Sequence, residues 1–520
     1  MAEEKKKILW VDDEIDLLRP HVLFLENKGY DVVTVTNAED AIDLIKQDNF
    51  NLILLDEMLN GMDGLTALAE FKDINPGLPV IMITKSEEES LMDEAIGNKI
   101  DDYLTKPVNP SQILLVCKKI LDKTRIAGQK ISRDYASEFN QISTRLMGPM
   151  EWQDWIDIHV KLSEWDIELD QHPDLGLRQT LYDQKREANS EFGRYIEHNY
   201  KSWLYSDDGP FFSPDIVKEY VLPHIKENKN TVLMVIDAMR LDQWLVLEPL
   251  LRQYYRITRN HYYSILPTAT PYSRNAIFSG LFPSEIEKQY PELWQQSVQE
   301  DDVSRNQNEH ELLNAQLQRL RIPLKPGPKY MKILDVDDAQ ALSQKILDFG
   351  HAPLSAIVLN FVDILGHTRS SSSVIKEMIP NESAFRSTTR AWFEHSYIFR
   401  ALRKLAENGN TVVITSDHGS IRGLHGTKVI GDRQTSTSLR YKYGRNLKVN
   451  PKHAIILKNP TAFKLPVRGV NTNYIIAKED YYFVYPTNYH YYLNYYADSF
   501  QHGGISLEEC ILPVMTLEPK

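Results

Sequence analysis

The stretch Thr411–Ser420, TVVITSDHGS, constrains the fold of this chain most strongly. Its apolar and β-branched residues lead directly into Asp417 and His418, which is typical of a buried parallel strand that ends on polar side chains. In open α/β sheets, ligands bind beyond the carboxyl ends of the strands. An adjacent carboxylate and imidazole there suit a divalent transition metal, although such a pair alone is as often structural. The stretch therefore predicts an α/β sheet with a candidate metal site at one edge.

The length of 520 residues predicts two to four domains. Two cysteines, Cys117 and Cys510, give no disulfide framework. No apolar run approaches the roughly 20 residues of a membrane helix, and the start, MAEEKKK, lacks the apolar core of a signal peptide. These features predict a cytoplasmic protein without membrane insertion. The net charge of −13 argues against a nucleic-acid-binding surface over the whole chain, although a local site can still be positive.

Residues 1–122 alternate strand-like runs with helical segments, which predicts a doubly wound parallel sheet. Carboxylates, a hydroxyl and a lysine follow four of these runs. Three carboxylates on one rim repel one another unless a cation lies between them, and Mg²⁺ prefers such an all-oxygen site. A Mg²⁺-bound Asp beside a lysine and a hydroxyl can accept a phosphoryl group, because the metal and the lysine offset the developing charge. Any one of these residues alone also fits a solvated strand end.

This stretch resembles the receiver domain of bacterial response regulators over about 120 residues. The resemblance implies that Asp56 is the phosphoacceptor and that a sensor histidine kinase is a partner. It also implies two Mg²⁺-binding acids, a hydroxyl and a lysine that contact the phosphoryl group, and a switch aromatic: Asp12, Asp13, Thr84, Lys106 and Tyr103. A cis bond between Lys106 and Pro107 is expected with that family.

Residues 123–215 predict a central helical bundle that connects two domains. Apolar side chains recur there at spacings of three and four, which places them on one helix face: Trp152, Trp155, Ile158, Leu162, Trp165 and Leu169. Such a stripe favours packing between helices over a cofactor site. A DNA-binding transcriptional regulator is a further alternative for this region, but no compact basic recognition helix stands out.

Residues 216–520 contain further apolar runs that end on metal-type ligands. NTVLMVIDAMR, AIVLNFVDILGH and SFQHGG add four candidate ligands to the two of the first stretch, which makes a set of six: Asp237, Asp363, His367, Asp417, His418 and His502. A helix after the second run would point its Asp and His the same way. Six such ligands suit two open zinc sites of three protein ligands each. Each residue alone also fits a helix cap, a surface imidazole or a turn.

Thr270 precedes Pro271, and proline suits the first position of a helix. Backbone N–H groups at a helix start favour an anion nearby. A threonine hydroxyl is a poor nucleophile at neutral pH, and a metal lowers its pKa. Thr270 is therefore a hydroxyl at a helix start beside a candidate two-metal site, whose ions, roughly 4 Å apart, would hold attacking and leaving oxygens in line. Arg240 and Arg274 are the candidate phosphate contacts.

The motifs VIDAM, PTATPYSR, DILGH, SDHG and QHGG resemble those of the PglZ family of the alkaline phosphatase superfamily. The resemblance implies an alkaline-phosphatase-like α/β domain with Thr270 as nucleophile. It divides the six ligands between two metals, one on Asp363, His367 and His502 and the other on Asp237, Asp417 and His418. The sulfatase branch uses Cys or Ser in C/S-x-P-x-R, a pattern absent here. The three regions together resemble the PorX-type response regulators, a family tied to type IX secretion.

A basic stretch lies between Ile421 and Asn450, with seven Lys or Arg and one acidic residue. Tyrosines interleave with the basic residues, a combination that a flexible anionic strand would use. Arg440 and Lys442 are therefore candidate substrate contacts, and a solvated loop or a dimer contact is the equal alternative. The run DYYFVYPTNYHYYLNYYAD indicates strand and core packing rather than a base-stacking platform.

These patterns predict a two-component response regulator whose receiver controls a two-zinc phosphodiesterase or phosphatase. A nucleotide or oligonucleotide is the expected substrate. Phosphorylation of Asp56 is expected to turn Tyr103 inward and make the face at residues 87–122 self-complementary, which predicts a homodimer. The alternative is a phosphorylation-switched regulator that binds a protein such as a sigma factor and uses its metals structurally.

Overall fold

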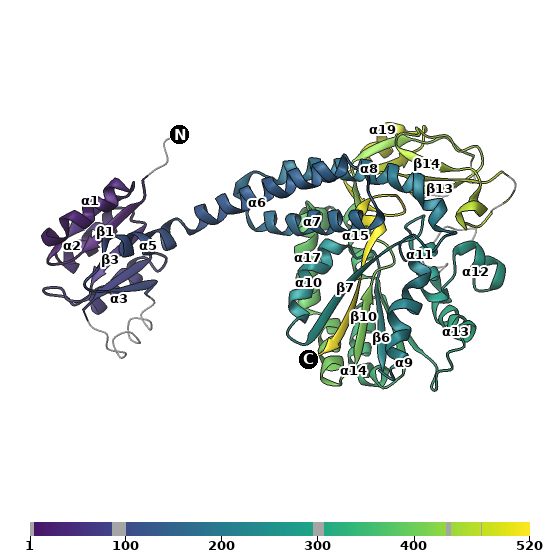
Figure 1. Cartoon of the computed structure of the whole chain (residues 1–520), viewed down its shortest axis with the longest axis horizontal. Helices are drawn as coiled ribbons and strands as arrows, with labels where there is room; N and C mark the ends of the chain where they lie inside the picture. Colours follow the sequence, from purple (N-terminus) through teal and green to yellow (C-terminus); the bar gives the residue numbers. More distant parts are fainter. Residues whose placement is uncertain (1–4, 86–99, 295–305, 433–437, 468, 470) are drawn as a thin grey trace. The chain divides into compact units, whose positions relative to one another are not determined.

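The structure, a computed structural model, describes residues 5–85, 100–294, 306–432, 438–467, 469 and 471–520 (Figure 1). The chain divides into two compact units, Met1–Ala136 and Ser137–Lys520. Each unit is built around its own β-sheet. The predicted α/β class is confirmed for both.

A five-stranded parallel sheet forms the centre of the first unit, in the order β2-β1-β3-β4-β5. Among the described residues, α1 and α5 pack on one face and α2 and α3 on the other. Both faces are apolar because successive side chains of a strand point to opposite sides. Leu9 and Val11 pack beneath α2 and α3, whereas Ile8 and Trp10 pack beneath α1 and α5. The elements are β1 (Lys7–Val11), α1 (Arg19–Asn27), β2 (Asp31–Val35), α2 (Ala38–Gln47), β3 (Leu52–Asp56), α3 (Gly64–Ile74), β4 (Val80–Thr84), β5 (Asp102–Thr105) and α5 (Pro110–Leu121).

The connector is helical, as predicted, and consists of α6 (Lys123–Leu146), α7 (Trp152–Gln171) and α8 (Arg178–Trp203). The apolar face of α7 is buried at four positions, namely Trp155, Ile158, Leu162 and Leu169. Besides α8, this helix contacts α10 (Leu241–Leu251) and α20 (Leu507–Cys510) of the C-terminal domain. The connector helices from Ser137 onward therefore belong to the second compact unit and do not form a bundle apart from it.

A six-stranded mixed sheet forms the centre of the second unit, in the order β7-β18-β10-β6-β9-β8. The four strands β10, β6, β9 and β8 are parallel, and β18 runs antiparallel to both of its neighbours. The parallel register aligns the carboxyl ends of β10, β6 and β9 at one edge. The strands are β6 (Thr231–Ile236), β7 (Tyr255–Tyr263), β8 (Lys329–Ile333), β9 (Leu354–Leu359), β10 (Thr411–Thr415) and β18 (Ile511–Pro519).

Helices flank this sheet, and their apolar faces form its main core. On α18, Ile398, Leu402 and Leu405 recur at helical spacing and join the same core as Val412 and Ile414 of β10. Among the described residues, none of the helices is both long and apolar enough to span a membrane. Besides α10, the helices of this domain with described bounds include α9 (Leu222–Lys226), α11 (Thr270–Ser279), α12 (Pro283–Gln289), α13 (Glu309–Arg319), α14 (Val336–Gly350), α15 (Phe361–Ser371), α16 (Ser373–Met378), α17 (Glu382–His395) and the α18 just described (Tyr397–Glu407).

A smaller lobe of short strands follows β10 and leads back to the sheet (Figure 1). The tyrosine-rich run was predicted to be strand and core, and this is correct only for its first part. The second part is an exposed helix, on which the side chains of Tyr491 and Tyr495 are 63% and 53% exposed. The lobe comprises β11 (Ile421–Gly423), β12 (His425–Lys428), β13 (Tyr441–Gly444), β14 (Ala454–Leu457), β15 (Asn473–Ala477), β16 (Tyr481–Val484), α19 (Tyr489–Tyr496) and β17 (Ser499–Gln501).

Candidate metal centre

The first ligand group lies at the carboxyl ends of two adjacent strands. Asp237 directly follows β6, and Asp417 and His418 follow β10 by one intervening residue. All three side chains are buried, and each offers a ligand atom within 4.8 Å of the others. The predicted grouping of these residues is therefore present in the structure, because the two parallel strands end side by side.

The second ligand group combines a helix and a turn. Asp363 and His367 lie one turn apart on α15, and His502 follows β17. The Nε2 atom of His367 lies 3.3 Å from His502 Nε2 and 3.3 Å from Asp363 Oδ1, and His502 Nε2 lies 3.7 Å from the same Oδ1. Ligand atoms around a tetrahedral zinc, at ~2.05 Å from the ion, would stand about 3.3 Å apart. The spacing therefore suits a tetrahedral ion.

The two groups adjoin each other. The rings of His418 and His502 stack with centroids 4.2 Å apart and planes at 18°. Asp237 and Asp417 carry like charges in a buried position, and burial together with the Asp237 charge raises the pKa of Asp417 well above its usual range. The Oδ2 atom of Asp417 accepts no hydrogen bond from the described residues. A bound cation would give this oxygen atom a ligand contact and would relieve the repulsion between the two carboxylates.

Thr270 lies at the edge of the first group. Its Oγ1 is 2.9 Å from His418 Nε2 and 3.5 Å from Asp237 Oδ1. Thr270 is itself the first residue of α11, one position further into the helix than expected, and Pro271 follows in the first turn. The hydroxyl thus lies at a helix N-terminus, where unpaired N–H groups favour negative charge.

Arg274, also on α11, is brought to the same place. Its guanidinium lies 2.7 Å from Asp237 Oδ2, 2.7 Å from Glu309 Oε1 and 3.8 Å from Asp417 Oδ2. Glu309 was not predicted, and nothing in its local sequence indicates this role. Asn360 was also missed, and its amide donates to Asp237 Oδ2 at 3.0 Å. Its position directly after the apolar run of β9 could have identified it.

Three predicted phosphate or substrate contacts are engaged elsewhere. The guanidinium of Arg240 is held by Asp242 at 2.8 Å and by Glu382. Arg440 is buried against Glu509, and Lys442 is buried on β13 with its Nζ 4.6 Å from the centre of the Tyr485 ring. The alternative that Arg440 and Lys442 lie in a solvated loop is therefore wrong, because both are buried and this part of the stretch pairs with β15. Residues 433–437 of the same stretch lie outside the described residues.

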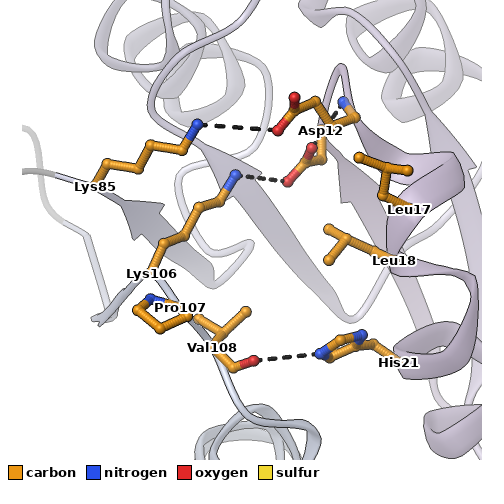
Figure 2. Close-up of a pocket in the computed structure, with 9 residues that line it drawn as sticks. Asp12, Leu17, Leu18, His21, Lys85, Lys106, Pro107 and Val108 are labelled. Carbon is orange, nitrogen blue, oxygen red and sulfur yellow. Dashed lines mark hydrogen bonds and ion pairs between the residues drawn. The ribbon is translucent and has the colours of Figure 1, made fainter.

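In the first unit, the predicted acidic residues form a third ligand group. Asp12, Asp13 and Asp56 offer ligand atoms within 4.8 Å of one another, and this all-oxygen set fits Mg²⁺. Lys106 Nζ lies 2.9 Å from Asp56 Oδ2 and 3.1 Å from Asp12 Oδ2. Burial raises the pKa of Asp56, although the hydrogen bond from Lys106 opposes this shift. The adjoining pocket has a volume of about 500 Å³ and is lined by Asp12 and Lys106 among others. In Figure 2, Lys106 extends toward Asp12.

The expected switch residues occupy neighbouring positions. The Thr84 hydroxyl donates a hydrogen bond to the Glu57 carboxylate. The ring of Tyr103 is 42% exposed. The Lys106–Pro107 bond is cis, as predicted. Part of the face predicted to mediate dimerisation, residues 87–99, lies outside the described residues.

Comparisons with known families match three successive stretches of the chain. The response regulator receiver domain matches residues 8–118, and the PorX response regulator linker domain matches residues 125–204. The BREX system PglZ alkaline phosphatase-like domain matches residues 216–517. These matches confirm the resemblance of each region to its family.

Curated relatives match the receiver region. The alkaline phosphatase synthesis transcriptional regulatory protein PhoP of Bacillus subtilis is 36% identical over 124 residues, which is 24% of this chain and 51% of that protein. The transcriptional regulatory protein SrrA of Staphylococcus aureus is 31% identical over 132 residues, which is 25% of this chain and 54% of that protein. The match spans about half the length of these relatives.

Solved structures also match this region. The CheY-like receiver domain protein of Methanospirillum hungatei has 32% identity and a TM-score of 0.23, and covers 23% of this chain and 96% of its own. The NtrX receiver domain of Brucella abortus has 32% identity and a TM-score of 0.21, and the match covers 22% of this chain and 98% of that domain.

The PglZ match by itself extends over more than half of the chain, and it follows the receiver and linker matches in order. The chain therefore belongs to the PglZ alkaline phosphatase-like family and is a response regulator of the PorX type.

Proposed function

We propose that this response regulator is a metal-dependent phosphodiesterase whose output domain binds two zinc ions. The observation that carries the proposal is the position of the Thr270 hydroxyl beside two adjoining ligand groups. Its Oγ1 lies 2.9 Å from Nε2 of His418, whose ring stacks on His502 of the second group. A phosphoester bound there would meet a nucleophile and two cation sites at once.

Zinc is the proposed metal in both groups. Three imidazoles and three carboxylates make up the donor set, and imidazole ligands favour zinc over Mg²⁺. The near-equal spacing of 3.3 to 3.7 Å in the second group also fits tetrahedral coordination. Three protein ligands at each site leave a position open for substrate, which is typical of catalytic rather than structural zinc.

When bound, the zinc ions would lower the pKa of the nucleophile and of water, and offset charge on the phosphoryl oxygens. Thr270 Oγ1 would give its proton to water and form a bond to phosphorus while the bond from phosphorus to the leaving oxygen breaks, and the leaving oxygen would take a proton from water and depart as an alcohol. This step gives a phosphothreonine, which water then hydrolyses to restore the hydroxyl. Arg274 would contact the phosphoryl group, since a metal on Asp237 takes over the carboxylate with which Arg274 is paired.

The proposed substrates are nucleotides or oligonucleotides. Arg440 and Lys442 no longer support this choice, because both are buried. The support comes from α19, where the exposed rings of Tyr491 and Tyr495 stack at 6.0 Å and 14°. Lys428 lies over the neighbouring Tyr489 ring at 5.4 Å. Exposed aromatic rings beside a cation suit the bases and backbone of a single strand.

A receiver domain implies a cognate histidine kinase that phosphorylates it, and we propose that phosphorylation of Asp56 controls the output domain. The finer parts of the proposal are a cytoplasmic location, a role in type IX secretion and a sigma factor as protein partner. These parts rest on the likeness of the chain to the PorX type.

The test compares wild type with Thr270→Ala, using bis-p-nitrophenyl and mono-p-nitrophenyl phosphate together with metal analysis of the purified proteins. We expect two zinc ions per chain in both proteins and a fall in hydrolysis of about 10³-fold or more in the variant, because the nucleophile is lost. Thr258→Ala, at an exposed position on β7, is the matched control and should hydrolyse at the wild-type rate.

Two results would contradict the proposal. Unchanged turnover in Thr270→Ala would remove this residue as the nucleophile. A wild-type protein that stays metal-free after preparation from zinc-replete cells would remove the two-zinc centre, and with it the enzymatic role.

A further inference from the structure

The short helix α20 lies directly behind both ligand groups. The turn that follows His502 leads into it, and the glycine after His418 rests on it. Gly419 N donates to the Glu509 carbonyl at 3.3 Å. A Cβ at Gly419 would lie only 1.8 Å from the Glu508 carbonyl oxygen, so the backbones pack too closely for any side chain. A shift of α20 would therefore move His502 through this turn, whereas His418 is also held by the end of β10, three residues before it.

The connector helix α8 holds α20 from one side. Asn189 Oδ1 accepts from Leu507 N at 2.7 Å, and Asn189 Nδ2 donates to Glu508 Oε2 at 3.0 Å. Leu507 is the first residue of α20, so its N–H has no partner within the helix. One amide side chain thus satisfies the backbone and the carboxylate of α20 at once.

A buried ion pair strengthens the same contact. Lys185 Nζ, one turn before Asn189, lies 3.2 Å from Glu508 Oε1 and 2.6 Å from Asp166 Oδ2 of α7. Burial disfavours the charge on Glu508, but Lys185 outweighs it and the pKa of Glu508 falls to about 2. Removing one charge from such a buried set leaves another unpaired, which costs far more than the loss of a surface ion pair.

The smaller lobe holds the preceding turn from the other side. Glu509 Oε1 accepts from Gly504 N at 2.8 Å and from Arg440 Nε at 3.1 Å. A Cβ on Gly504 would lie 2.3 Å from Arg440 Nη2. Arg440, expected to contact substrate, instead packs against the turn that carries His502.

We propose that Asn189 and Lys185 of the connector are positioning residues of the metal centre, which set His502 against Asp363 and His367 by fixing α20. This inference rests on the proposed two-zinc function. It also gives the connector a direct mechanical link to the site, because α8 is in turn tied to α6 through a hydrogen bond from Gln184 Nε2 to the Phe139 carbonyl at 3.0 Å. A displacement of α8 would loosen the second ligand group before the first, whose ligands Asp237 and Asp417 follow strands of the central sheet.

The test measures zinc content and zinc affinity, the latter by competition with a chelator, together with hydrogen exchange in residues 501–510. Asn189→Asp keeps the acceptor for Leu507 N but places a second carboxylate against Glu508. We expect one of the two zinc ions to bind about 10- to 100-fold more weakly, as is typical when a group that supports a ligand is lost, and exchange in residues 501–510 to accelerate. Asn199→Ala is the matched control, because this asparagine on α8 bonds only within its own helix in the described contacts.

The double variant Asn189→Asp with Glu508→Gln separates positioning from general loss of stability. The new carboxylate keeps the bond from Leu507 N and can accept from the new amide, so the hydrogen bond to residue 508 returns with its direction reversed and the total charge is unchanged. We expect zinc affinity and slow exchange to recover toward wild type. Wild-type affinity and exchange in Asn189→Asp would overturn the inference, and so would a double variant no better than the single one. A wild type that binds fewer than two zinc ions would instead contradict the proposed function.

Discussion

At the residue scale, the two ligand groups differ in how much of their charge the protein balances. Asp363 is flanked by two imidazoles; burial opposes its charge, but His367 and His502 hold its pKa below the usual range. Asp417 instead faces the carboxylate of Asp237, with Arg274 as the nearby counter-charge. The second group thus combines one carboxylate with two imidazoles, whereas the first combines two carboxylates with one imidazole.

The separation of the six ligands into two sets predicts the effect of His502→Ala on metal content. The variant should lose one zinc ion and keep the other, because the second group falls to two protein ligands while Asp237, Asp417 and His418 remain. Elemental analysis after dialysis against a weak chelator measures the stoichiometry. His490→Ala, at an exposed histidine of α19, should keep both ions. Loss of both ions, or of neither, in His502→Ala would contradict two separable sites.

A second prediction at this scale concerns acid sensitivity. Burial lowers the pKa of His159 on α7 to about 4, from a usual value of 6.5. Between pH 4 and pH 6.5, the unfolded chain therefore binds a proton at His159 that the folded chain does not bind. The contribution of this residue to the free energy of unfolding is thus most favourable above pH 6.5 and becomes less favourable as the pH drops toward 4. At pH 5, His159 should therefore lower the free energy of unfolding by about 2 kcal/mol.

His159→Gln tests this prediction. Urea unfolding at pH 7 and pH 5, followed by tryptophan fluorescence, should show a difference between the two pH values about 2 kcal/mol smaller than in wild type. His172→Gln, at the partly exposed end of α7, should keep the wild-type difference. An equal difference in all three proteins would mean that His159 does not contribute to the acid sensitivity.

At the scale of elements, the sequence was informative wherever an apolar run ended on polar residues. Asp237 and Asp417 were found because each closely follows a continuous buried strand, and the parallel register then brings them together. Glu309, Asn189 and Glu509 were missed because their partners lie far away in the sequence and no local pattern marks them. Composition misled at the Tyr-rich run, because β-propensity is overridden when a segment folds as an exposed helix such as α19.

The exposure of α19 predicts a substrate-dependent effect of its tyrosines. Replacing Tyr491 and Tyr495 by Ala should raise KM for a short single-stranded oligonucleotide by about 10-fold or more, since base stacking on an aromatic ring contributes ~1–3 kcal/mol per base. Turnover of bis-p-nitrophenyl phosphate should stay unchanged. Tyr205→Ala, at another exposed tyrosine, is the control. An equal rise in KM for both substrates would point to a structural role for α19 instead.

At the scale of the whole molecule, α6 carries the chain from the receiver unit into the output unit, so a phosphorylation signal must pass through a two-state element. We expect phosphate on Asp56 to draw in the Thr84 hydroxyl, which now bonds Glu57, and to let the exposed Tyr103 ring turn inward. The receiver would then pair with a second copy through a two-fold interface.

Beryllofluoride, a phosphoryl mimic, should therefore shift wild type from monomer to dimer in sedimentation velocity. Asp56→Ala should remain monomeric under the same conditions. The rate of phosphodiester hydrolysis should change only in wild type. If the mimic leaves wild type monomeric with its hydrolysis unchanged, the proposed coupling is wrong.

The central position of β18 has a consequence for the order in which the protein is made. Residues 511–519 form β18, which lies between β10 and β7 in the sheet. The edge strand β7 therefore cannot join the sheet until this stretch has left the ribosome. The receiver sheet is complete by residue 105 and can form while most of the chain is still being translated. A stalled or prematurely terminated nascent chain would thus offer a kinase a folded receiver sheet while its alkaline phosphatase-like domain remains unfinished. Such a fragment would consume the signal without producing a response.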